Sequence, residues 1–183
     1  QKLDNAGIAY SVIRGNHDLV GYNDSTKTDY MTQYLGTAAY KSQFATGGFY
    51  DENISNSWRT FKVGNINYLM LALDFGPTDE VLAWAGEIIA DHPDHSVIIT
   101  THAYLYRDGT TLDAKDTAPP SNYTQYGAQN NGDQIWEKLV SKYENIVLVL
   151  SGHDPSDNII VSRDKGDHGN IVTSMLIDPQ GVD

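Results

Sequence analysis

The chain has 183 residues, no cysteine and a formal net charge of -12, from 24 acidic and 12 basic residues. Its length suits one domain with a hydrophobic core, and the lack of cysteine excludes disulfides, thiolate metal ligands and a cysteine nucleophile. The acidic surface argues against general nucleic-acid binding. No apolar run approaches the roughly 20 residues that span a bilayer. A phosphorylated substrate remains compatible, because bound cations reverse the local field.

The first elements in chain order are a helix end and a strand. Residues 1–7 read as the last turn of a helix closed by Gly7, and "IAYSVI" at 8–13 reads as a strand. A helical region is expected near 28–44, with weak periodicity. Both ends of the sequence look cut from something longer, and no signal peptide is recognisable at the start.

The rest of the chain alternates strands and helices. Two amphipathic helices are predicted at 78–91, with Thr78 as the N-cap, and at 132–143. A long polar loop, 107–130, is expected to be functional or mobile. The alternation predicts an α/β fold, layered as an αββα sandwich of two sheets. The β-branched and aromatic runs that predict strands are 58–63, 66–73, 96–101, 146–151, 158–163 and 171–177, with hairpin turns at Gly64-Asn65 and 164–170.

Polar residues gather where the predicted strands end. The strand at 8–13 leads into Asn16, His17 and Asp18, and those at 96–101 and 146–151 lead into His102 and His153. The strand at 66–73 ends at Asp74. Ligand sites of open α/β sheets lie at the carboxyl ends of the strands, where the loops converge. A joint site is therefore favoured over three isolated loop histidines.

The residue types restrict the chemistry of that site. Neutral imidazole with amide or carboxylate oxygen suits Zn, Mn, Fe, Ni or Mg. A hydrolase triad of Ser151, His102 and Asp74 has no supporting spacing, and no glycine-rich phosphate loop is present. The other three histidines are predicted to be surface residues, namely His92, His95 and His168.

Three motifs in order resemble the calcineurin-like metallophosphoesterase superfamily. They are "GNHD" at 15–18, "TTHAY" at 100–104 and "SGHD" at 151–154. The stretch "LALDFGPTDEVLAWAGEII" also resembles the family's connection between blocks. The resemblance covers about residues 8–160. It implies an αββα fold in which two divalent ions activate a hydroxide that attacks a phosphoester.

The resemblance also implies a role for each motif residue. Asn16, His102 and His153 would be ligands of one metal ion. His17 would stabilise or protonate the phosphate, and Asp18 would fix the orientation of His17. Arg14 would be a structural ion-pair partner or a phosphate contact.

The chain also departs from the family pattern. The family's first two blocks, Asp-x-His and Gly-Asp-x-x-Asp/Asn, are missing, since only 14 residues precede "GNHD" and "GDHGN" at 166–170 reads as a turn. The last block has Pro155 where the family has a second histidine, so Asp154 or Asp157 is a candidate replacement. The expectation is one truncated metallophosphoesterase-like domain over 1–183, weak or inactive alone. Its full-length parent would hydrolyse phosphomonoesters or phosphodiesters.

Other readings stay open. The chain can be a non-catalytic binding or surface module that retains the fold and has lost metal ligands. Without the early strand of the family, a sheet would have an exposed edge or gap, so self-association or a local distortion is expected. The composition suits a bacterial extracellular or cell-surface protein somewhat better than a cytoplasmic one.

Overall fold

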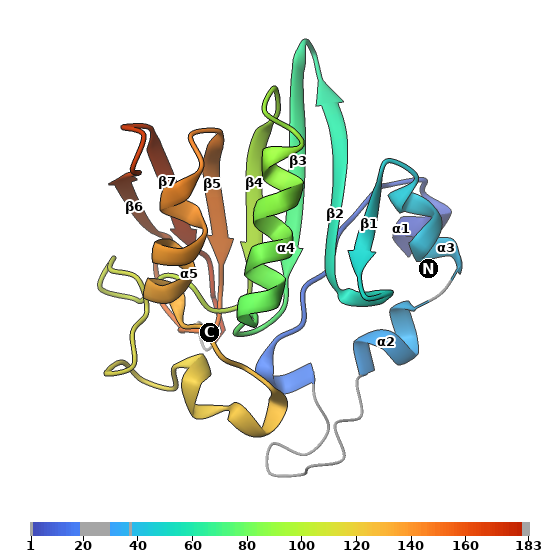
Figure 1. The fold of residues 1–183 in the computed structure, drawn as a ribbon. Helices are drawn as coiled ribbons and strands as arrows, with labels where there is room; N and C mark the ends of the chain where they lie inside the picture. Colours follow the sequence, from blue (N-terminus) through green and yellow to red (C-terminus); the bar gives the residue numbers. More distant parts are fainter. Residues whose placement is uncertain (1, 19–29, 37, 181–183) are drawn as a thin grey trace.

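The computed structural model describes residues 2–18, 30–36 and 38–180. Within these residues, seven strands form one sheet in the order β1-β2-β3-β4-β5-β7-β6 (Figure 1). The described part of the chain therefore supplies one β layer of the predicted αββα sandwich. The strands are β1 Gly47–Tyr50, β2 Asn53–Val63, β3 Ile66–Leu73, β4 Ser96–Thr101, β5 Ile146–Ser151, β6 Ile160–Lys165 and β7 Ile171–Leu176.

The centre of the sheet is parallel and its flanks are antiparallel. Strands β3, β4, β5 and β7 run in the same direction, whereas β1 and β2 on one side and β6 on the other pair antiparallel. The four parallel strands consequently end at one edge, at the bottom of Figure 1. Chain segments leaving these strands are brought together there.

Two helices cover one face of the sheet (Figure 1). Helices α4 and α5 pack on Leu69, Leu71, Val97, Ile99 and Val149, which form the buried core with them. The helices are α1 Lys2–Asn5, α2 Tyr30–Leu35, α3 Ala38–Lys41, α4 Asp79–Ala90 and α5 Gly132–Lys138, with 3₁₀ turns at Asn16–Asp18, Ser42–Phe44, Pro120–Asn122, Thr124–Tyr126 and Val140–Lys142. No helix of the described residues is both long and apolar enough to cross a membrane.

Most predicted elements are confirmed. The α/β fold is present, β3, β4 and β5 have their predicted bounds, and Thr78 caps α4 by accepting from the N–H of Val81. Helix α5 ends earlier than predicted and continues into a 3₁₀ turn. The helical region near 28–44 is two short helices and a 3₁₀ turn, and residues 28, 29 and 37 lie outside the described residues.

The strand predicted at 8–13 is wrong. Within the described part of the chain, these residues belong to no strand of the sheet. The N–H of Tyr10 donates instead to the side chain of Gln43 at 3.0 Å, and the N–H of Val12 to the hydroxyl of Tyr40 at 3.2 Å. An apolar run becomes a strand only if another strand accepts its backbone hydrogen bonds, and here side chains accept them.

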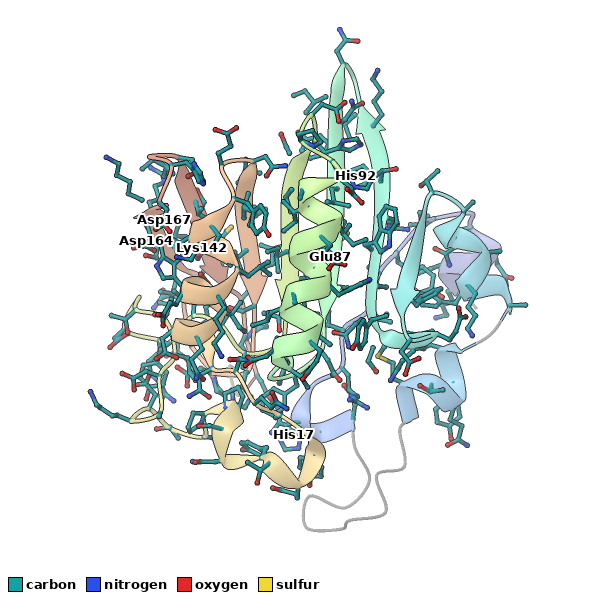
Figure 2. The ribbon with its side chains drawn as sticks, in the orientation of Figure 1. His17, Glu87, His92, Lys142, Asp164 and Asp167 are labelled. Carbon is teal, nitrogen blue, oxygen red and sulfur yellow. The ribbon has the colours of Figure 1, made fainter. Side chains whose placement is uncertain are left out.

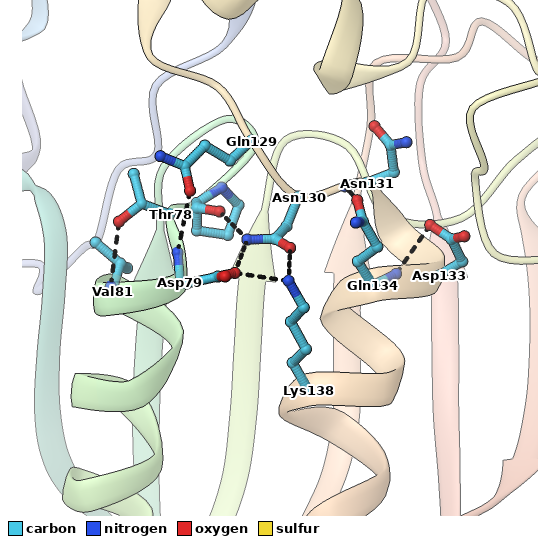
Figure 3. Close-up of polar contacts among 10 residues, drawn as sticks. Thr78, Asp79, Val81, Gln129, Asn130, Asn131, Asp133, Gln134 and Lys138 are labelled. Atoms are coloured by element: carbon cyan, nitrogen blue, oxygen red, sulfur yellow. Dashed lines mark hydrogen bonds and ion pairs between the residues drawn. The ribbon is translucent and has the colours of Figure 1, made fainter.

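A buried amide ties the long loop to both covering helices (Figure 3). Asn130 is 1% exposed, and its amide nitrogen donates to the carbonyl of Pro77 at 2.8 Å and to the Asp79 carboxylate at 2.9 Å. Its amide oxygen accepts from the ammonium of Lys138 at 2.8 Å. The hydrogen bonds from Lys138 and Asn130 lower the pKa of Asp79. The start of α4 and the body of α5 are thereby fixed to the end of the loop.

We expect Asn130→Ala to lower the free energy of unfolding by about 2 kcal/mol. The substitution removes the side-chain hydrogen bonds to the Pro77 carbonyl, the Asp79 carboxylate and the Lys138 ammonium, and only the backbone N–H of residue 130 still donates to the Pro77 carbonyl, at 3.3 Å. Each lost bond contributes about 0.5–1.5 kcal/mol to stability. Urea unfolding followed by circular dichroism measures the effect. Asn122→Ala, at an exposed position of the same loop, is the matched control and should change stability by less than about 0.5 kcal/mol. Equal effects of the two substitutions would contradict the account.

Candidate metal centre

The "GNHD" segment forms a closed turn at the carboxyl edge of the sheet. The N–H of Gly15 donates to the Asp18 carboxylate at 2.7 Å, and the N–H of Asp18 donates back to the Gly15 carbonyl at 3.1 Å. This turn buries Asn16, which is 3% exposed, and leaves His17 and Asp18 exposed. Figure 2 shows His17 at this edge. The turn thus directs one motif side chain inward and the next to the surface.

Asn16 and His102 meet although 86 residues separate them. Nε2 of His102 donates to Oδ1 of Asn16 at 3.0 Å. Ligand atoms that bind one ion at about 2.1 Å from perpendicular directions are about 3.0 Å apart. The carboxamide oxygen and this ring nitrogen therefore have the spacing of two ligands of one ion, once the ring proton is displaced.

His153 lies beside this pair in a left-handed backbone conformation. Its φ is 75°, uncommon for a residue other than glycine. Its Nε2 donates to the carbonyl oxygen of Ala118, at 2.8 Å, in the long loop. This bond leaves Nδ1 as the nitrogen with the lone pair. A backbone carbonyl that accepts from one ring nitrogen while the other binds the ion is the usual arrangement for a metal-ligating histidine.

Both imidazoles are in a low-polarity environment. Their ring centroids are 5.0 Å apart, and the Phe75 ring contacts both, at 5.7 Å from His102 and 5.2 Å from His153. Burial, followed by the nearby His153, lowers the pKa of His102 to about 4, against the opposing effect of Asp178 and Asp18. Burial also lowers the pKa of His153. Both rings are consequently neutral at pH 7, as metal ligands must be.

A pocket of about 420 Å³ adjoins the two rings on the face of the sheet opposite α4 and α5. Its wall is partly apolar, with a few polar groups near the imidazoles, including the carboxylate of Asp178. The lining residues are Ser11, Ile13, Met70, Thr100, His102, Leu150, Ser151, Gly152, His153, Ile177, Asp178 and Gln180. The two histidines therefore line an open pocket in addition to contacting each other and Phe75.

Asp154 has a partner that the sequence did not indicate. Its carboxylate, in a residue that is 3% exposed, accepts from the backbone N–H of Arg107 at 2.8 Å, from Nε at 2.9 Å and from Nη2. Both oxygens are thus engaged by Arg107, and Asp157 is exposed. The geometry gives Asp154 a structural function in place of the metal-ligand function considered for it from the sequence.

The remaining histidines lie elsewhere. His92 is at the far end of α4, shown at the top of Figure 2, and its ring contacts those of Trp58 and His95. His168 is exposed in the β6–β7 hairpin, where its Nε2 donates to the Lys142 carbonyl. The prediction of a surface position is confirmed for His168, whereas His92 and His95 are partly buried.

The donor set fits one metal ion incompletely. Among the described residues, no three His, Asp or Glu side chains cluster to hold an ion. The amide of Asn16 and the two neutral imidazoles can supply ligands, but the described residues offer no carboxylate that forms a three-membered ligand group with both imidazoles. Without that negative charge, a divalent ion recovers less of its desolvation energy. Asn16, His102 and His153 can therefore provide some, but not all, of the ligands of a divalent ion.

We expect Gly15→Ala to weaken divalent-ion binding by about 10-fold with little effect on folding. An alanine Cβ would lie 3.0 Å from Cε1 and Nε2 of the His102 ring and would displace it from Asn16. A shift of this kind in a ligand resembles the loss of an outer-shell partner, which costs about 10–100-fold in affinity. Titration with Mn²⁺ followed by calorimetry measures the change. An unchanged affinity for Mn²⁺ would show that ion binding does not depend on the present position of the His102 ring.

Comparison with known proteins gives two similarities. A model of the family described as calcineurin-like phosphoesterase matches residues 1–157. The chain is also 32% identical over 184 residues to a protein of Bacillus subtilis (strain 168) described as "Uncharacterized protein YvnB". That alignment covers 98% of this chain and 13% of the relative. The chain thus spans a small part of the length of the curated relative that it matches.

Proposed function

Because the chain belongs to the calcineurin-like phosphoesterase family, we propose that it forms part of the catalytic centre of a metal-dependent phosphoester hydrolase. The observation that carries the proposal is the 3.0 Å approach of Asn16 Oδ1 and His102 Nε2, with His153 alongside. Two segments distant in the sequence meet there with ligand spacing. The full-length protein would act on a phosphorylated substrate, a phosphomonoester or a phosphodiester.

Asn16, His102 and His153 are proposed to hold one divalent ion. A bound ion supplies Lewis-acid stabilisation of phosphoryl oxygens and lowers the pKa of bound water. The low pKa of His102 and His153 keeps both rings available as neutral ligands. Their nitrogen donors with an amide oxygen suit Mn, Fe, Zn, Ni or Mg without selecting one of them.

His17 and Asp18 are proposed to act on the phosphate. His17 is exposed at the same edge as the ligand residues and next to Asn16 in the chain. From there its imidazole would donate to a phosphoryl oxygen or protonate the leaving oxygen. Asp18 closes the turn through the N–H of Gly15, which supports a role in fixing the position of His17.

A second reading is that the chain is a non-catalytic binding module of the same fold. It is favoured by Asp154, whose carboxylate oxygens both accept from Arg107, and by Pro155 at the position of a usual ligand. On both readings, the proposal is that this chain alone is weak or inactive. They differ in what the full-length protein does.

The test is hydrolysis of bis-p-nitrophenyl phosphate and p-nitrophenyl phosphate by the full-length protein in Mn²⁺. We expect metal-dependent turnover that falls by at least about 100-fold in His17→Ala, the scale for losing a group that acts in the transition state. His168→Ala is the matched control and should retain activity. If the unaltered protein shows no turnover, the catalytic proposal fails and the binding module is favoured; if both proteins turn over substrate equally, the role proposed for His17 fails.

Self-association through a sheet edge stays a prediction. Among the described strands, the sheet ends at β1 and β6. Strand β6 carries Arg163, Asp164 and Lys165, and charges on an edge strand oppose pairing with another chain. Light scattering would test the prediction, and a monomer at all concentrations would count against it.

A further inference from the structure

Asp74 is hydrogen-bonded to three different segments around the candidate metal centre. Its carboxylate accepts from Nε of Arg14 at 2.9 Å and from Nη2 of the same guanidinium. Its N–H donates to the side chain of Asn56 at 2.8 Å, and its carbonyl accepts from the Thr101 hydroxyl at 3.1 Å. One residue at the end of β3 therefore holds the segment before "GNHD", strand β2 and the end of β4.

These contacts lie one or two residues from the groups that meet in the site. Arg14 is two residues before Asn16, and Thr101 directly precedes His102. Phe75, whose N–H donates to the Asp74 carboxylate at 2.8 Å, contacts both imidazole rings. Asp74 therefore contacts the residue before His102, the residue two before Asn16, and Phe75, whose ring contacts both imidazoles.

The bidentate ion pair between Arg14 and Asp74 can hold the segment before "GNHD" in a defined position. A guanidinium fixes a carboxylate in direction as well as distance, which an ammonium does not. Both side chains are 15% exposed, so water competes little with the pair. Arg14 thus links the segment that precedes "GNHD" to the end of β3, just before the turn.

We propose that Asp74 is a positioning residue, whose carboxylate sets the distance between Asn16 and His102 by holding Arg14. The effect of Asp74 on metal binding rests on the proposed function. The effect of Asp74 on the His102–Asn16 hydrogen bond does not rest on it. Asp74 is assigned no contact with metal or substrate, because its carboxylate oxygens accept from Arg14 and Phe75.

The test compares Asp74→Asn and Arg14→Lys with Asp167→Asn. Asp167 forms an ion pair with Lys142 away from the site, shown in Figure 2. The first readout, in the metal-free protein, is the tautomer of His102 by long-range ¹H–¹⁵N correlation spectra. The second is affinity for Co²⁺ by visible absorption. Thermal unfolding is recorded for each variant, so that a loss of stability is separated from a loss of position.

In Asp74→Asn we expect His102 to lose its single Nε2–H tautomer and Co²⁺ affinity to fall by about 10-fold, the scale for outer-shell partners. Arg14→Lys should give an intermediate loss, and Asp167→Asn none. If Asp74→Asn fails to fold, the His102 tautomer and the Co²⁺ affinity of Arg14→Lys test the proposal. An unchanged tautomer and affinity in both site variants would overturn the proposal. If the unaltered chain binds no Co²⁺, the proposed function fails, and the tautomer readout still decides the positioning role.

Discussion

His102→Ala is expected to weaken binding of Mn²⁺ by more than about 100-fold. The loss of an outer-shell partner already costs about 10–100-fold, and His102 is proposed as a direct ligand with its Nε2 3.0 Å from the Asn16 oxygen. Without His102, only the Asn16 oxygen and Nδ1 of His153 would remain of the three proposed ligands. Isothermal titration calorimetry at pH 7 measures the effect.

The control for this result is a histidine that serves no proposed ligand function. His168→Ala removes an exposed imidazole in the β6–β7 hairpin and should leave the affinity unchanged. Equal losses in the two variants would mean that the ion binds non-specifically to surface histidines. No loss in either would exclude His102 as a ligand.

Gly132→Ala is expected to lower the free energy of unfolding by about 3 kcal/mol, the upper part of the range for overpacking. A Cβ at this position would overlap the carbonyl oxygen of Tyr104 and lie 3.0 Å from the Leu112 nitrogen. The clash is with backbone, so no side-chain rotation can relieve it. Gly132 begins α5, and the substitution would separate that helix from the segment following His102.

Gly127→Ala is the matched control for the clash. Gly127 has φ of 79° in the same loop, and a Cβ there would meet nothing within 4 Å. It should cost about 1–2 kcal/mol through backbone strain alone. Urea unfolding of both variants separates the two causes. If Gly132→Ala costs no more than Gly127→Ala, the close approach of α5 to Tyr104 is not required for stability.

The elements of the sheet centre could be predicted because their hydrophobic runs are bounded by turn residues. Strands β3, β4 and β5 match the predicted ranges for this reason. Strand β1 was missed, since "GGFY" carries no alternating pattern. The strand predicted at 8–13 failed for a different reason: its composition is that of a strand, but pairing depends on a neighbour that the sequence pattern does not reveal.

The residues of the candidate site could be predicted from the sequence, but the contacts that hold them could not. Histidines close to the ends of two strands, together with "GNHD", predicted that Asn16, His102 and His153 lie near one another, and the structure brings them together. The contacts that hold them were not predictable from sequence. Arg107 and Asp154 are 47 residues apart and Arg14 and Asp74 are 60 apart, and no spacing rule connects such pairs. The position of Asp74 at the end of a predicted strand indicated that it lies near the site. It did not indicate that Arg14 is its partner.

The central claim is that Asn16, His102 and His153 converge on one divalent ion. Crystals of the chain soaked in Mn²⁺ and measured at the manganese absorption edge test it most directly. We predict an anomalous peak about 2.0–2.2 Å from Oδ1 of Asn16 and Nε2 of His102, next to the His153 ring. A peak at His92 and His95, or none at this edge of the sheet under saturating Mn²⁺, would contradict the claim.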